Sequence, residues 1–141
     1  MSAFEPHCTA SSLLRPGCAS LAVREARKLV ADLIDGCSRA GCQEAVRRAD
    51  DVLLVVSELV TNACRHAGGA DEVRVRCERG ELVVEVEDGS ETTPREPVDE
   101  AKGETGGYGC QLVTALADRW GVAPRQDEGC GKTVYAGFAL N

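Results

Sequence analysis

Residues 50–69 read DDVLLVVSELVTNACRHAGG, and this stretch decides the fold. Its apolar residues recur at helical spacing and predict a helix from about Ala45 or Asp50 to His66. Residues 52–60 are apolar nearly all round, which is typical of a helix that is buried on most sides. We therefore expect this helix to lie at the centre of the fold.

Two polar side chains interrupt the buried helix. Glu58 and Asn62 lie one helical turn apart on one face, and Arg65 and His66 continue that face. One interpretation is structural, with both side chains bonded to neighbouring backbone or to Arg65. The other is functional, because an asparagine oxygen is a ligand for a hard cation such as Mg²⁺. The glutamate could then take a proton or position a nucleophile.

The surrounding pattern predicts one domain of helices and strands. The expected elements are helix 19–39, strands 72–79 and 82–87 in an antiparallel hairpin, helix 110–117, and strands 118–122 and 133–140, with a short strand near 5–9. Asp50 or Asp51 would cap the helix of the opening stretch. Residues 90–106 form a polar loop longer than the roughly 12–15 residues usual in compact domains, as in active-site lids. We expect residues 1–141 to form a single domain.

Two further segments carry unusual residues. Asp88 ends a predicted strand and precedes Gly89, so it forms either an ordinary turn or an acceptor for an exocyclic amine such as that of adenine. Residues 106–109, GGYG, open a helix and form either a lid hinge or a backbone cradle for phosphate. The run 131–133, GKT, resembles the end of a P-loop. Position 126 is glutamine and a strand follows, so we reject a P-loop there.

Composition excludes several classes of protein. The chain has 141 residues and a net charge of −7, which argues against nucleic acid as a partner. No stretch approaches the roughly 20 apolar residues of a membrane span, and no secretory signal is present. We therefore expect a cytoplasmic protein without a membrane partner. The eight cysteines include no CxxC pair, which favours reduced, packed thiols over a zinc site or disulfides.

Taken in chain order, these segments resemble the motifs of one known family. Residues 58–67, ELVTNACRHA, resemble the N box of the GHKL (Bergerat-fold) ATPases. More narrowly, they are similar to the anti-sigma-factor serine/threonine kinases and their many actinobacterial relatives. Residues 86–90, VEDGS, resemble the G1 box, and residues 107–113, GYGCQLV, resemble the G2 box. Residues 115–121 and 131–134 match the end of that family, so the likeness covers nearly the whole chain.

The resemblance implies a fold, a cofactor and roles for individual residues. The fold is α+β, a two-layer α/β sandwich whose mixed, mainly antiparallel sheet has helices on one face, with residues 90–106 as the ATP lid. Asn62 would hold Mg²⁺ against the phosphates of ATP, and Glu58 would be the general base or orient the attacking hydroxyl. Asp88 would bind the adenine amino group. The other implied cofactor-binding residues are Arg65, His66, Gly89, Gly107, Tyr108, Gly109, Cys110 and Thr133, the last close to Asp88.

The resemblance also implies an activity. The chain would transfer the γ-phosphoryl group of ATP to a serine of a STAS-domain anti-sigma factor antagonist. A separate surface would hold a sigma factor, and the resemblance leaves room for a homodimer. Ser90 in the G1 box and Tyr108 between the G2 glycines depart from the family pattern. They motivate an alternative, a non-catalytic ATP-binding regulatory module that acts by protein-partner capture.

Overall fold

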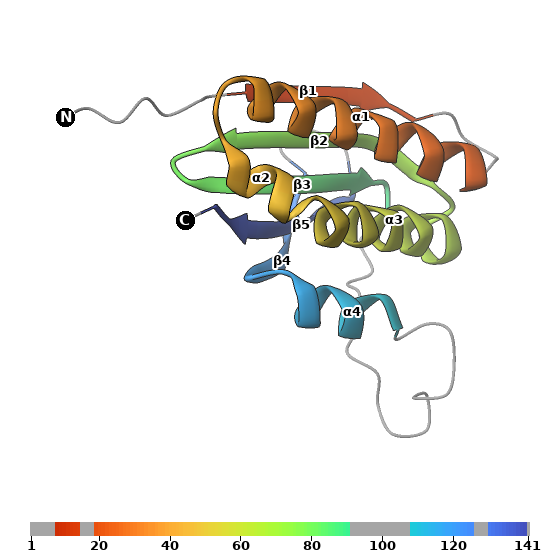
Figure 1. Ribbon diagram of the computed structural model, residues 1–141. Coiled ribbons are helices and arrows are strands. Elements are labelled where there is room, and N and C mark those ends of the chain that lie inside the picture. The colour runs from red at the N-terminus through yellow and green to blue at the C-terminus, as the bar shows by residue number, and fades with distance from the viewer. Residues whose placement is uncertain (1–7, 15–18, 91–107, 126–129, 141) are drawn as a thin grey trace.

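The computed structural model describes residues 8–14, 19–90, 108–125 and 130–140. It shows one sheet with helices on one of its faces (Figure 1). In chain order the elements are β1 (Cys8–Leu13), α1 (Ala19–Arg39), α2 (Gln43–Arg47), α3 (Ala49–His66), β2 (Ala70–Glu78), β3 (Glu81–Asp88), α4 (Tyr108–Leu116), β4 (Arg119–Pro124) and β5 (Lys132–Ala139). In this described part, no helix is both long enough and apolar enough to cross a membrane.

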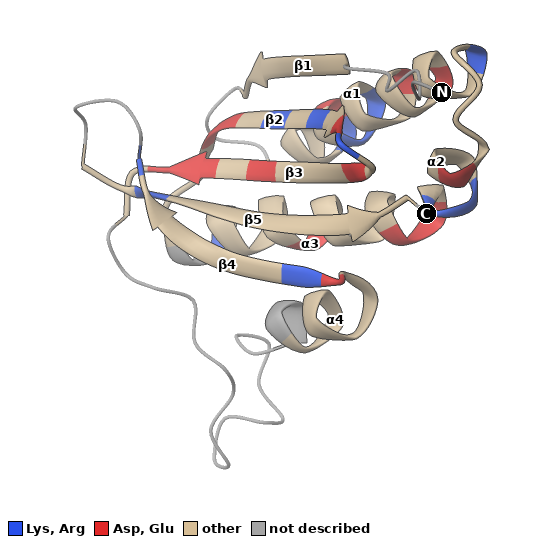
Figure 2. Cartoon of the chain, turned by 90° about the vertical axis from the view of Figure 1, so that its left-hand side faces the viewer, with Lys and Arg blue, Asp and Glu red and all other residues tan. Residues whose placement is uncertain are grey.

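The sheet has five strands in the order β1-β2-β3-β5-β4, and each neighbouring pair is antiparallel. The predicted α/β sandwich is confirmed, although the described strands include no parallel pair. The predicted hairpin is β2 and β3. Its turn residues Arg79 and Gly80 have φ of 55° and 72°, as a two-residue type I′ turn requires. Figure 2 shows the molecule turned by 90°, with the strands in front of the helices.

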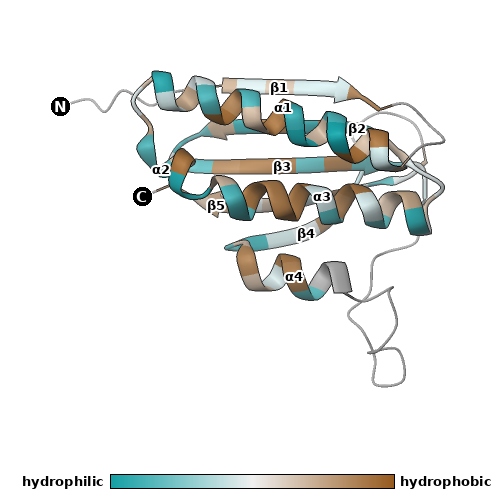
Figure 3. Cartoon of the chain, turned by 45° about the vertical axis from the view of Figure 1, so that its right-hand side comes forward, coloured by the Kyte–Doolittle hydropathy of each residue, from teal (hydrophilic) through white to brown (hydrophobic). Residues whose placement is uncertain are grey.

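The core lies between the sheet and the helices α1 and α3. The α3 residues Val52, Val55, Val56 and Val60 are fully buried, and α1 packs beside α3. Figure 3 shows the apolar bands of these helices and of β3. The helix α3 is buried on most sides, as predicted, and Leu54, which is 43% exposed, lies on its remaining side. One side of α3 therefore faces solvent.

The helix and strand bounds refine the sequence predictions. Of the two starts left open for the central helix, the structure agrees with the one near Asp50, because α3 begins at Ala49; the short helix α2 precedes it, and Arg48 between them makes no side-chain cap. Asp50 and Asp51 lie in the first turn of α3 and not at its cap. Their charges still suit that position, because the helix N-terminus favours anions. The first strand continues past its predicted end near Thr9 to Leu13, because it pairs with β2 as far as Glu72, and residues 5–7 of the prediction lie outside the described residues.

The cysteine side chains behave as packed thiols. The six cysteines whose side chains are described are all free. Cys8 lies opposite Cys77 in the β1–β2 pair, and Cys77 contacts Cys37 and Cys42 through side-chain hydrogen bonds. Burial raises the pKa of Cys37 and of Cys77, so both thiols stay protonated. Free thiols agree with the sequence prediction, but only Cys37 and Cys77 of the six described cysteines are fully buried, and Cys130 is exposed.

Candidate nucleotide site

Two of the elements that carry the predicted site meet at one end of the sheet. The second half of α3 and the Asp88 end of β3 lie at the same end in Figures 1 and 3. The helix α3 also contacts both β3 and α4. Helix and strand therefore bring the N-box side chains and Asp88 to one region of the covered face.

Asp88 is the most buried charged residue of this region, with 1% of its surface exposed. Its Oδ1 atom accepts a hydrogen bond from the backbone N–H of Ser90 at 2.8 Å and another from Lys132 Nζ at 3.0 Å. Lys132 Nζ also donates to the Ser90 carbonyl at 3.3 Å. Within the described residues no partner binds Asp88 Oδ2. One carboxylate oxygen is thus held by the protein, and the other can accept a hydrogen bond from a ligand.

Gly131, directly before β5, packs its backbone against that of Asp88. Its φ is 134°, and a Cβ at this position would overlap the carbonyl oxygen of Asp88 and lie 2.7 Å from Cδ of Arg125. Only glycine fits this close approach of two backbones. Gly89 is different, because a Cβ there would meet nothing nearer than Asp71 Oδ2 at 3.9 Å. Among the described residues, a Cβ at Gly89 would therefore make only an ordinary van der Waals contact.

The N-box pair lies on α3 as the sequence predicts. Glu58 and Asn62 are both half-buried, and Asn62 Oδ1 is a buried atom without a hydrogen-bond partner in the structure. Leaving a buried acceptor unpaired costs about 1–3 kcal/mol. Glu58 makes no hydrogen bond or ion pair with any described residue, so the structural interpretation of this pair has no support. Ser57, by contrast, donates to the Leu53 carbonyl at 2.8 Å within the helix.

Lys132 is the site residue that the sequence reasoning missed. The register of β3 and β5 places Asp88 opposite Lys132, and three apolar pairs precede it along the strands: Leu82–Phe138, Val84–Ala136 and Val86–Val134. The alternation of β5 alone could have found it, because Lys132 shares the face of Val134, Ala136 and Phe138.

Thr133 lies on the other face of the sheet, contrary to the prediction that places it close to Asp88. It is the register partner of Glu87, and its Oγ1 donates to Glu87 Oε2 at 3.4 Å. Successive side chains of a strand point to opposite faces, so Lys132 and Thr133 cannot both face Asp88. The residue beside the Asp88 carboxylate is Lys132.

The remaining predicted residues are only partly described. Gly107 and the predicted lid after Ser90 lie outside the described residues, and Tyr108, Gly109 and Cys110 are described only as the first turn of α4. Arg65 is exposed near the end of α3, and His66 is its last residue. Their roles stay predictions.

Charged residues lie along β2 and β3 (Figure 2), and some of them form a separate network on the uncovered face of the sheet. Arg74 donates to Glu85 at 3.0 Å and to Glu87 at 3.2 Å, and Arg76 donates to Glu85 at 2.9 Å. Burial raises the pKa of Glu85, but the hydrogen bonds from Arg76 and Arg74 outweigh burial and hold it below its ordinary value. This network satisfies its own charges.

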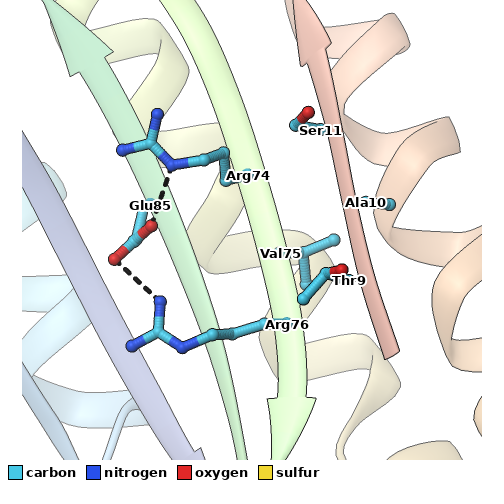
Figure 4. A pocket seen from close by; sticks show the side chains of 7 residues that line it. All are labelled: Thr9, Ala10, Ser11, Arg74, Val75, Arg76 and Glu85. Carbon is cyan, nitrogen blue, oxygen red and sulfur yellow. Dashed lines mark hydrogen bonds and ion pairs between the residues drawn. The ribbon is translucent and has the colours of Figure 1, made fainter. Parts of the chain in front are cut away.

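A cavity of 440 Å³ lies beside that network (Figure 4). It is lined by Thr9, Ala10, Ser11, Arg74, Val75, Arg76 and Glu85. The two arginines approach Glu85 from either side, and each forms an ion pair with it. None of the predicted nucleotide-binding residues lines this cavity, which is distinct from the site around Asp88.

The fold and the covered face together define the class of protein. The protein is an α/β sandwich with an antiparallel sheet, a helix that carries Glu58 and Asn62, and a buried carboxylate at a strand end. Residues 19–137 match the histidine kinase-like ATPase domain. Because this match spans well over half of the chain, the protein belongs to that family, which is of the GHKL type. No curated protein matches the chain.

Proposed function

We propose that this protein is a regulatory ATP-dependent protein serine/threonine kinase of the anti-sigma type. Its substrate would be a serine of a STAS-domain anti-sigma factor antagonist, and a separate surface would bind a sigma factor. Homodimer formation and a cytoplasmic location belong to the same proposal. Family membership supports kinase-like use of ATP. The observation that carries the site is the buried, unpartnered oxygen of Asn62.

Asn62 fits the metal that this proposal needs. Its Oδ1 is a neutral oxygen held without a protein donor, which suits a hard cation. Mg²⁺ in such enzymes is held by few protein oxygens together with substrate phosphates. Among the described residues, no group of three or more His, Cys, Asp or Glu could hold a metal ion. Asn62 and the phosphates would bind the same Mg²⁺ ion, and the ion would neutralise the negative charge of the phosphates.

Glu58 is placed for proton transfer or for orienting a hydroxyl. It lies one turn before Asn62, is half-buried, and has no partner among the described residues. A carboxylate in that state can accept the proton of a substrate serine hydroxyl. Phosphoryl transfer otherwise rests on positioning and charge neutralisation, so one carboxylate beside the bound ATP suffices.

The alternative, an ATP-binding module that only captures a partner, rests on Ser90 and Tyr108. Ser90 contributes its backbone N–H and carbonyl around Asp88, and both groups are independent of its side chain. The presence of serine at position 90, which departs from the family pattern, is therefore compatible with adenine binding by Asp88. The side chain of Tyr108 lies outside the described structure, so the assay below must separate the two functions.

The test combines binding and transfer. Calorimetry with ATP, with and without Mg²⁺, is performed on the wild type, Asn62→Ala and Glu58→Ala. Asp32→Ala, which changes an exposed carboxylate on α1, is the control. We expect Mg²⁺-dependent binding to be lost in Asn62→Ala and retained in the other two variants. Phosphoryl transfer is then measured with labelled ATP and STAS-domain proteins from the same genome. Glu58→Ala should reduce transfer by about 10²–10⁴-fold.

Each outcome distinguishes a different hypothesis. Absence of ATP binding in the wild type would contradict the nucleotide site. ATP binding without phosphorylation of any STAS-domain serine, together with unchanged partner binding in Glu58→Ala, would favour the capture module over the kinase.

A further inference from the structure

The two oxygen atoms of the Asp88 carboxylate have different surroundings. Its Oδ1 accepts two hydrogen bonds, from the Ser90 N–H and from Lys132, whereas no described residue binds Oδ2. The side chains of Asp88 and Lys132 are 2% and 9% exposed, respectively. Solvent therefore competes little for these bonds, and the orientation of the carboxylate is set by the protein.

Lys132 is itself held in place. Its ammonium group donates to Asp88 Oδ1 at 3.0 Å and to the Ser90 carbonyl at 3.3 Å, so it closes a ring with the Ser90 N–H. Gly131, the preceding residue, packs its backbone against that of Asp88 and Gly89. The segment that carries Lys132 cannot move away from Asp88 without breaking this backbone contact.

A carboxylate recognises an amino group only when the carboxylate is ionised and correctly oriented. An ionised oxygen accepts hydrogen bonds and cannot donate one. It therefore selects a base with an exocyclic amino group over a base that carries a hydrogen atom or a carbonyl at the same position. A buried carboxylate without a partner is costly, and a single neutral donor would orient it less firmly. A paired ammonium and a backbone N–H on the same oxygen satisfy both conditions.

We infer that Lys132 is a positioning residue for base recognition: together with the Ser90 N–H it fixes Asp88 Oδ1 and leaves Oδ2 to accept the 6-amino group of adenine. This inference rests on the proposed role of Asp88 in reading the base. It assigns to Lys132 the selectivity for a 6-aminopurine, and it assigns no contact between Lys132 and the phosphates.

The experiment measures selectivity and not only affinity. Dissociation constants of ATP and of purine riboside 5′-triphosphate, which lacks the 6-amino group, are measured with Mg²⁺ by calorimetry. The proteins are the wild type, Lys132→Met and Lys132→Gln, with Lys28→Met as control. Lys28 is an exposed lysine paired with Asp32 on α1, so its removal causes the same change in charge far from the site. Thermal melts establish that each variant is folded.

We expect the wild type and Lys28→Met to prefer ATP by about 10- to 100-fold, the worth of a hydrogen bond to a charged group. Lys132→Met should bring the ratio of the two constants to within about threefold, because Oδ1 loses its charged partner. Lys132→Gln keeps a neutral donor and should give an intermediate ratio. If the Met variant does not fold, the Gln variant carries the comparison.

The results separate the inference from the proposed function. A wild type that binds neither triphosphate would overturn the nucleotide site itself. If the wild type binds ATP and purine riboside 5′-triphosphate equally, recognition of the 6-amino group by Asp88 would be wrong, and so would the inference. If Lys132→Met weakens both triphosphates by the same factor, the preference for ATP is unchanged. Lys132 would then be a structural residue, and the inference would be wrong although the site stands.

Discussion

Gly131→Ala is the most direct test of how the strand end is built. The new Cβ would overlap the carbonyl oxygen of Asp88 and approach Cα of Gly89 to 2.9 Å. A side chain at φ of 134° is also strained. Backbone strain of this kind costs about 1–3 kcal/mol, and overpacking in a closed space costs about 1–3 kcal/mol. We expect a loss of about 3 kcal/mol in the free energy of unfolding.

Gly68→Ala provides a matched control for this prediction. Gly68 also has a positive φ, 79°, but an added Cβ would meet nothing within 4 Å. Its substitution should cost only the conformational part, about 1–2 kcal/mol. Urea unfolding followed by circular dichroism measures both values. Equal losses in the two variants would refute the close approach of Gly131 to Asp88, and the argument that this contact fixes Lys132 would fail too.

Three further predictions concern other parts of the molecule. Arg48 donates to two backbone carbonyls, of Leu116 at 3.2 Å and Ala139 at 2.9 Å, so Arg48→Met should lower the free energy of unfolding by about 2 kcal/mol. The exposed Arg39→Met should change it by less than about 0.5 kcal/mol, and equal effects in urea melts would contradict this. The pKa of Glu85 is lowered on folding, so its ionised form stabilises the protein above the ordinary pKa of 4.5, and that contribution is lost as the pH falls through the lower folded value. The stability gap between wild type and Glu85→Gln should therefore shrink between pH 7 and pH 3, and a constant gap would contradict the ion-pair network. Alkylation followed by mass spectrometry should modify exposed Cys130 first and buried Cys37 only on unfolding, whereas equal rates would mean that Cys37 is accessible.

The sequence predicted the elements of this fold well because each has a clear period. Alternation identified β2 and β3, and helical spacing identified α1 and α3 within a few residues of their ends. The starts were less predictable. The break at Arg48 has no capping side chain, so no local signal marks it. The extent of β1 as far as Leu13 depends on pairing with β2, which is a long-range contact.

The site was predictable where a single segment carries it. Glu58 and Asn62 stand out because they interrupt an apolar helix, and Asp88 because it ends a strand before glycine. The expectation that Thr133 lies close to Asp88 came from a motif and took no account of the sheet's two faces. The face of a strand residue is set by the pairing of two strands, here Asp88 with Lys132 and Glu87 with Thr133.

The ionic pair at the strand end needs an explanation other than stability. On the covered face, the three preceding pairs of β3 and β5 are apolar, and only the last one joins a carboxylate to an ammonium. Buried ion pairs often contribute no more than a well-packed apolar pair, and replacing one can stabilise a protein by about 1–4 kcal/mol. Stability alone would therefore favour a fourth apolar pair at Asp88 and Lys132. A bound base changes this balance, because the free Oδ2 of Asp88 then gains a donor that an apolar pair could not bind. If that gain accounts for the pair, replacing both residues by apolar ones should preserve or raise the melting temperature and abolish the preference for 6-aminopurines. A large loss of stability in that double variant, with the preference retained, would show that the pair is structural.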